Sequence, residues 1–266
     1  ALTHIFVIAM PMTCIAVLFP EIGRDLSLDL VQISVVWGLL PVGGILVTLL
    51  GGLLGDRFGV KRVLIVGCVL VGLAGALRGT SGSFAALATT SFLFGVLVAV
   101  IPLNVHKLAN IWVPKERAGL ANGMLSMGMA VGFTVSTAIS ARWLSPELGG
   151  WRNVLYLLGG ISLVFAILWS LTRNVGQHSV VPEQSVGKVP FKEALLKVLR
   201  MKRIWLLGLV LLGQAGSVRS MLGYVPTYLE TQRGWADATG GGPLVVFHLT
   251  SAVFTVPIAF LSDRIG

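Results

Sequence analysis

The chain has 266 residues, of which 55% are hydrophobic and only 12% carry a charge. Soluble domains contain about 25% charged residues, so this composition excludes a soluble globule and indicates an integral membrane protein. The net charge is +9, but the basic residues are spread along short polar joints and do not gather on one face. Nucleic acid is therefore not an expected partner, whereas membrane lipid is.

Long apolar stretches with few charges alternate with short polar joints along the chain. Each stretch can cross about 30 Å of hydrocarbon as a helix, which rises about 1.5 Å per residue. The strict alternation of apolar and polar residues that a transmembrane barrel needs does not occur in the sequence. The sequence therefore predicts an all-α integral membrane protein with helices over residues 1–19, 30–54, 61–78, 84–112, 118–142, 153–172, 204–229 and 243–261.

A longer polar connection, from Arg173 to Arg203, separates the first six predicted helices from the last two. Within it, residues 191–200 form an amphipathic run that is typical of a helix on a membrane surface. We expect an N-terminal transmembrane domain at residues 1–172, a cytoplasmic linker at 173–203 and the start of a second transmembrane domain at 204–266.

The joint between the second and third predicted helices, Gly52–Arg62, contains one acid and three bases and is called the charged hairpin below. A joint this charged cannot lie in hydrocarbon, and its basic excess is typical of the cytoplasmic side. Most of the 20 Lys and Arg residues fall on that side of the predicted helices, whereas a few, including Arg78 and Arg152, fall on the other. A shorter version of the hairpin recurs at 261–266, which suggests an internally duplicated transporter.

The spacing of the hairpin residues follows the pattern Gly-x-x-x-Asp-Arg-x-Gly-x-Arg/Lys-Arg/Lys. The residues that occupy its defined places are Gly52, Asp56, Arg57, Gly59, Lys61 and Arg62. In this the chain resembles the major facilitator superfamily, where the pattern joins helices 2 and 3. The segments at 20–26, 112–117 and 150–152 are similar to further pieces of the same family.

The resemblance implies twelve helices in two six-helix domains, a central substrate site, alternating access and a monomeric transport unit when complete. Because eight helices are predicted, we expect the chain to be a fragment that covers helices 1–8. Two residues depart from family patterns: Ser91 stands where many proton-coupled members carry a buried Arg, and Phe133 stands where the antiporter pattern has Pro. The first departure disfavours standard proton coupling, and the second disfavours drug/proton antiport.

The resemblance also implies that Asp56 and its flanking bases form a latch between the domains, made and broken during transport. Asp263 and Arg264 occupy the matching place after the eighth predicted helix and are candidates for a second latch. A plainer interpretation is that Asp56 caps the third predicted helix, where a carboxylate complements free N–H groups, and that the bases anchor the joint at the membrane surface.

Ionisable groups inside a membrane are costly and therefore mark candidate functional sites. No Asp or Glu falls in the middle of a predicted helix, so the candidates are basic. Arg219, in the outer half of the seventh predicted helix, either holds an anionic substrate or extends to the external headgroups. Gln214 lies on a polar face of the same helix that points in a different direction from Arg219.

A polar stripe on the fourth predicted helix is formed by Asn104, Lys107 and Asn110, which recur every third residue. Helices 1, 4 and 7 line the cavity in the family that the chain resembles. The stripe is therefore expected to line the substrate path or to pack against the second domain, and Lys107 has the alternative of extending to the membrane surface.

Three histidines lie within predicted helices. His106 is next to the polar stripe and is as well explained by packing as by function. His4 and His248 could contact substrate or respond to protons, because imidazole changes charge near neutral pH.

The sequence contains no nucleotide-binding loop, metal-ligand cluster or nucleophile motif. We therefore expect no cofactor, no metal and no enzymatic activity. The predicted function is secondary or facilitative transport of a small solute, an anion with or without a coupling ion, across a plasma membrane or bacterial inner membrane, with the charged hairpin in the cytoplasm. The alternative is a transporter-like sensor or assembly protein, or a truncated product without flux.

Overall fold

The computed structural model describes residues 1–114, 117–172, 199–234 and 242–265, and these residues form helices and no strands. The predicted amphipathic run at 191–200 falls almost entirely outside the described residues. The prediction of an all-α fold is confirmed.

The helices follow the predicted order. The first span combines a π-helical turn, η1 (His4–Ala9), with α1 (Met10–Leu26), and α2 (Leu30–Phe58) and α3 (Val60–Gly79) follow. The next spans are α4 (Phe84–Val98) with α5 (Val100–Trp112), then α6 (Ala118–Ile139) with η3 (Ser140–Leu144) and α7 (Ser145–Leu148), then α8 (Trp151–Leu171). The last two are α10 (Lys202–Arg233) and α11 (Gly242–Ile265).

Several helices continue past their predicted ends. The first was expected to end at residue 19 but reaches Leu26, and the fifth was expected to end at 142 but its helical series reaches Leu148. The extra turns carry polar side chains that bond to one another, so the helix continues without exposing unpaired groups to hydrocarbon. A hydropathy pattern shows where the apolar residues end, and the helix itself ends several residues later.

Among the described residues, five helical segments are long and apolar enough to cross a membrane. The second predicted span makes a sixth if its two parts, Leu30–Ile45 and Leu50–Phe58, which bend by 47°, count as one. The helices α10 and α11, of 32 and 24 residues, also have sufficient length for about 30 Å of hydrocarbon. The chain is a multi-pass membrane protein.

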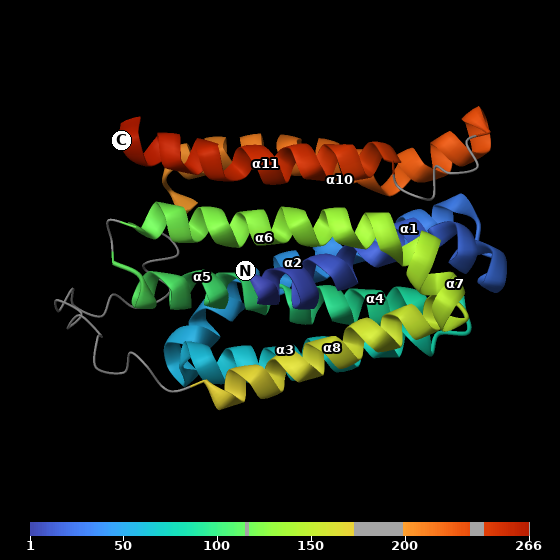
Figure 1. Cartoon of the computed structure of the whole chain (residues 1–266), viewed down its shortest axis with the longest axis horizontal. Coiled ribbons are helices and arrows are strands. Elements are labelled where there is room, and N and C mark those ends of the chain that lie inside the picture. Colours follow the sequence, from blue (N-terminus) through green and yellow to red (C-terminus); the bar gives the residue numbers. More distant parts are fainter. Residues whose placement is uncertain (115–116, 173–198, 235–241, 266) are drawn as a thin grey trace.

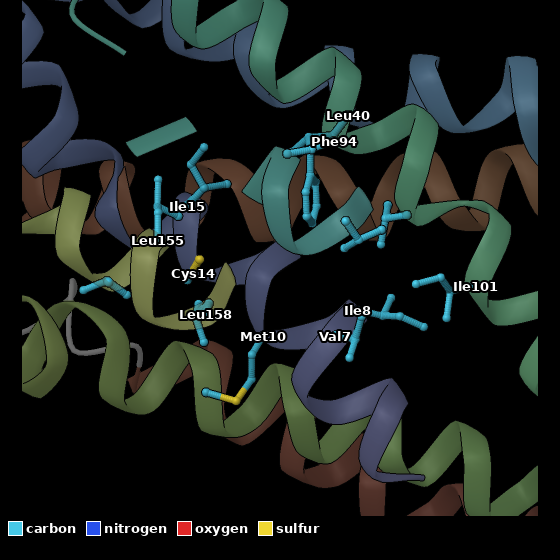
Figure 2. Packing of buried hydrophobic residues seen from close by; sticks show 14 of the residues in the cluster. Val7, Ile8, Met10, Cys14, Ile15, Leu40, Phe94, Ile101, Leu155 and Leu158 are labelled. Atoms are coloured by element: carbon cyan, nitrogen blue, oxygen red, sulfur yellow. The ribbon is translucent and has the colours of Figure 1, made fainter. Parts of the chain in front are cut away.

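The first span lies at the centre of the bundle. In its most apolar window 72% of the residues are buried, compared with 33–44% in the other four segments. Its side chains join one hydrophobic cluster with residues of α2, α4, α5 and α8, part of which Figure 2 shows. Around it, α3 packs along α8, α2 along α4 and α6 along α11 (Figure 1).

Candidate functional site

The charged hairpin turns at Gly59, whose φ of +86° lies in the region that only glycine adopts without strain. Asp56 lies in the last turn of α2, and α3 begins at Val60 with no side-chain cap. The expectation that Asp56 caps the third helix is therefore wrong, because α2 continues four residues beyond its predicted end.

The carboxylate of Asp56 pairs with Lys107 of α5, at 2.7 Å between Oδ1 and Nζ. The same ammonium donates to the carbonyl of Gly52 at 2.8 Å. The Asp56 side chain is 67% exposed, so water reaches this ion pair. Lys107 was expected on the substrate path or at the membrane surface. In this structure its ammonium binds two residues of the charged hairpin, and its role on the path stays a prediction.

The other bases of the hairpin differ in their contacts. Lys61 donates to the carbonyls of Ser170, at 3.4 Å, and of Thr172, which ties the start of α3 to the end of α8. The Arg57 guanidinium lies 5.5 Å from the ring centroid of Phe58, and Arg62 is exposed. The hairpin thus has bases whose charge no described carboxylate neutralises.

Asn104 is fully buried against α2. Its amide donates to the carbonyls of Gly51, at 3.0 Å, and Val100, at 2.7 Å. A Cβ at Gly55 would lie 2.0 Å from its Oδ1, so the side chain occupies the space that this glycine leaves. These contacts hold α5 against α2 and lie within the first six helices. The expected position of the polar stripe, on the substrate path or against the second domain, stays a prediction.

A chain of hydrogen bonds links α5 to α6 through Asn122. Its amide nitrogen donates to Oδ1 of Asn110 at 3.2 Å, and its Oδ1 lies 2.8 Å from Nδ1 of His106. Because an amide oxygen only accepts, a hydrogen bond at this distance requires a proton on Nδ1 of His106. His4 packs edge-on against the same ring, at 5.3 Å between centroids.

The six spans from η1 to α8 are called the first six helices below. Two cavities lie between these helices and the pair α10 and α11. The polar cavity, of about 280 Å³, is lined by His4, Pro102, His106, Ser126, Met129, Ala130, Phe133, Ser251 and Thr255. The mixed cavity, of about 250 Å³, is lined by Met12, Thr13, Trp37, Phe133, Gln214, Ala215, Val218 and His248. The structure thus brings four predicted path residues to two adjoining spaces that share Phe133.

The imidazoles in these cavities are buried and incompletely paired. His4 is 1% exposed, and neither of its ring nitrogens has a hydrogen-bond partner among the described residues. His248 is 3% exposed, its Nε2 likewise has no such partner, and its ring lies 5.3 Å from that of Phe133. A buried polar atom without a partner is unfavourable, so both rings have unused capacity for a polar ligand.

The remaining predicted residues stay predictions. Arg219 lies in α10, and Asp263 and Arg264 lie in the last turn of α11, but the positions of their side chains fall outside the described part of the structure. No group of three or more His, Cys, Asp or Glu that could hold a metal ion occurs where the structure is described.

At the end of the bundle away from the charged hairpin, α1, α7 and α8 meet in a group of bonds called the opposite-face network. Glu21 accepts from the Ser145 hydroxyl at 2.6 Å and from the Trp151 backbone N–H at 2.9 Å. Asp25 accepts from the Trp151 indole N–H at 3.1 Å and pairs with Arg152 at 2.5 Å. Sequence reasoning noticed these segments separately and did not connect them.

Arg78 is a buried cation that sequence reasoning placed in an outer polar joint. It lies in the last turn of α3 and is 0% exposed. Its Nη2 donates to the carbonyl of Pro11 at 2.9 Å, and its guanidinium lies 3.8 Å from the centroid of Phe94. Its Nε and Nη1 have no partner among the described residues. An Arg near the end of a strongly apolar run was the available signal for a buried site.

The described residues thus form a bundle of membrane-spanning helices with a charged hairpin and with cavities between the helices. Residues 2–266 match the family model described as Major Facilitator Superfamily, and the chain belongs to this family. The predicted resemblance is confirmed.

Curated relatives of the chain are similar at low identity. The chain is 25% identical to a probable sulfoacetate transporter of Cupriavidus necator over 83% of the chain and 54% of that protein. It is 27% identical to a probable nitrate/nitrite transporter of Mycobacterium tuberculosis, over 92% of the chain and 60% of that protein. It is 24% identical to a hexuronate transporter of Bacillus subtilis, over 95% and 60%. The chain spans 54–60% of the length of these relatives.

Proposed function

We propose that the protein carries a small anionic solute across the membrane by alternating access. The observation that carries this proposal is the pair of cavities between the first six helices and α10 and α11, each with a buried imidazole that has a nitrogen without a hydrogen-bond partner among the described residues. Sites that bind small molecules are mostly apolar with a few convergent polar groups, which describes the mixed cavity, and the polar cavity next to it adds further hydrogen-bonding groups.

The electrostatics of the cavities support an anion. Neither lining contains an Asp or Glu, so no described lining residue repels negative charge. Arg78 adds a buried positive charge within the first six helices, and neither described ion pair includes it. A buried charge acts over a longer range than one in water, because the surroundings screen it less. The names of the relatives, for sulfoacetate, nitrate or nitrite, and hexuronate, agree with this choice.

Alternating access needs contacts that break and re-form. The Asp56–Lys107 pair is water-exposed, and the hairpin has further bases without a described carboxylate, so Asp56 can exchange partners at low cost. The basic excess of the hairpin favours the cytoplasmic side. In this proposal the hairpin is a cytoplasmic latch, and the interface between α6 and α11 is where the two domains move against each other.

Uptake of a labelled panel of carboxylates, sulfonates and nitrate by proteoliposomes tests the proposal. We expect anion uptake that His4→Gln, His248→Gln and Arg219→Gln each reduce. The matched control is Arg233→Gln, an exposed Arg in the last turn of the same helix as Arg219, which should leave uptake unchanged. Lys107→Gln should slow uptake, because it removes the ion pair with Asp56 of the charged hairpin. Anion uptake that is absent from the unaltered protein, or equal in all these variants, would overturn the proposal.

A further inference from the structure

The polar and mixed cavities differ in chemistry, and they adjoin at one side chain, Phe133. We propose that they form a single substrate site with two compartments: the polar cavity takes the oxyanion group of a small organic anion, and the mixed cavity takes its uncharged body. This inference rests on the proposed function and narrows its substrate class to short organic acids, carboxylic or sulfonic, in preference to inorganic anions.

The polar cavity supplies donors from both sides. His4 of η1 offers a ring N–H, since neither of its nitrogens has a hydrogen-bond partner in the part of the chain that the structure describes. Ser126 of α6 and Ser251 of α11 add two hydroxyl groups, whereas the Thr255 hydroxyl donates to the carbonyl of Ser251 at 2.6 Å. Three donors satisfy much of the hydrogen-bonding capacity of a carboxylate or sulfonate. They come from the first six helices and from α11, so an oxyanion bridges the two parts of the molecule.

His106 completes this wall in a fixed orientation. Its Nδ1 is held by Asn122, which is itself bonded to Asn110, so the ring cannot turn to pair with His4 without breaking the chain of bonds. The T-shaped contact between the two rings places His4 against a rigid neighbour. The donor on His4 is therefore directed by packing before a ligand arrives, which lowers the entropy lost on binding.

The mixed cavity suits a neutral group of a few carbon atoms. Met12, Ala215 and Val218 supply apolar surface, and Trp37 and Phe133 supply aromatic surface. Gln214 and His248 contribute polar atoms without a permanent charge, and Nε2 of His248 has no partner among the residues described. A second carboxylate in this space would find no cation in the described lining, whereas a hydroxyl group would find hydrogen-bond partners.

Phe133 determines how the two spaces communicate. Its ring lies against His248 at 5.3 Å between centroids and takes part in the lining of both cavities. In the proposed site a ligand that occupies both cavities lies against this ring, because both linings include it. A smaller side chain at this position should therefore accept a larger organic group.

The experiment compares nitrate, which can fill only the polar cavity, with two- to six-carbon hydroxycarboxylates and alkanesulfonates, in uptake assays with the intact protein in proteoliposomes. Ser251→Ala should raise the KM for all anions by a similar factor, about fivefold, because each loses one hydrogen bond. Gln214→Leu should raise the KM for hydroxycarboxylates by about fivefold and leave that for nitrate within about twofold. Phe133→Ala should admit longer organic anions.

The matched controls are Thr250→Ala on α11 and Ser217→Ala on α10, exposed hydroxyls that line neither cavity and should leave every KM unchanged. Equal effects of Gln214→Leu on nitrate and on organic anions would overturn the two compartments, as would transport of nitrate alone; in both cases anion transport itself would stand. If no anion is carried, both the compartments and the proposed function are refuted.

Discussion

The two ends of the helical bundle each contain one carboxylate–cation pair, with similar distances and different surroundings. At the charged hairpin, Asp56 pairs with Lys107 at 2.7 Å. In the opposite-face network, Asp25 pairs with Arg152 at 2.5 Å and also accepts from the indole N–H of Trp151. Arg152 in turn donates to the Ser81 carbonyl at 3.3 Å and stacks 4.4 Å from the centroid of the Trp151 ring.

This difference separates a contact that can open from one that holds. The opposite-face network joins α1, α7, α8 and the segment before α4 through several bonds, so the loss of one leaves the others in place. The hairpin pair joins α2 to α5 through one exposed carboxylate, beside bases that can replace its partner. In the proposed transport cycle, the opposite-face network braces one end of the first six helices, and the Asp56–Lys107 pair can open at the other end.

Removal of Glu21 should give the largest loss of stability. Glu21→Ala leaves the Ser145 hydroxyl, which is 4% exposed, and the Trp151 N–H without their acceptor. Unsatisfied buried donors make the variant less stable by about 3 kcal/mol. Thermal unfolding in detergent measures the change. Glu147→Ala, which removes an exposed carboxylate from the neighbouring α7, is the matched control and should unfold like the unaltered protein. Equal stability of the two variants would show that the opposite-face network is no brace.

The network also shows what sequence reasoning could not reach. The partners of Glu21 and Asp25 lie more than a hundred residues away, for example Trp151, and Arg152 and Ser81 are 71 residues apart. Hydropathy and spacing place each segment at the end of a helix, but they contain no information on which helix ends meet. The charged hairpin was found from sequence because all its motif residues lie within one short joint, whereas its partner Lys107 lies on another helix and was interpreted separately.

Arg78 illustrates a second limit of sequence reasoning. Its position near the end of α3 was predicted, but the direction of its long side chain was not. The guanidinium turns back along α3 toward Gly75 and donates to the Pro11 carbonyl. Pro11 lies in the first turn of α1, directly after the π-helical turn that contains His4. Helix periodicity assigns a face to each residue, and the packing of three helices decides whether an end residue is exposed or buried.

Gly55→Ala tests the rigid part of the hairpin and should have the next largest effect. The new Cβ would lie 2.0 Å from Oδ1 of Asn104, so Asn104 must move and lose its bonds to the Gly51 and Val100 carbonyls. Overpacking of this kind lowers stability by about 2 kcal/mol. Gly38→Ala in the same helix, where nothing lies within 4 Å of the new Cβ, is the matched control. If both variants unfold alike in detergent, α2 and α5 are not held together by this contact.

Gly59→Ala tests the turn of the hairpin and should have a smaller effect. At φ +86° an alanine is strained by about 1 kcal/mol, although nothing lies within 4 Å of its Cβ. We expect a small decrease in the unfolding temperature. Gly59→Asn should not restore it, because Asn tolerates positive φ mainly in the left-handed helical region, and the ψ of +134° at Gly59 lies outside that region. A larger decrease for Asn than for Ala would indicate that space, and not backbone conformation, limits this position.

Substitution of Asp56 should have the smallest effect on stability and a large one on transport, which is the opposite of Glu21. An exposed ion pair contributes less than about 1 kcal/mol, so Asp56→Asn should unfold almost like the unaltered protein. If the pair stabilises one of two conformations that must interconvert, the maximal rate of uptake falls while the KM is unchanged. A tenfold decrease requires a change of only about 1.4 kcal/mol in the barrier.

Exchange of the charges, with Asp56→Lys and Lys107→Asp together, should recover the rate if pairing itself is what matters. Recovery in the double variant, but in neither single one, would identify Lys107 as the partner that Asp56 uses during transport. No recovery would point to Arg57, Arg62 or a residue of the second domain, since a carboxylate that changes partners depends on its position beside those bases as well as on Lys107.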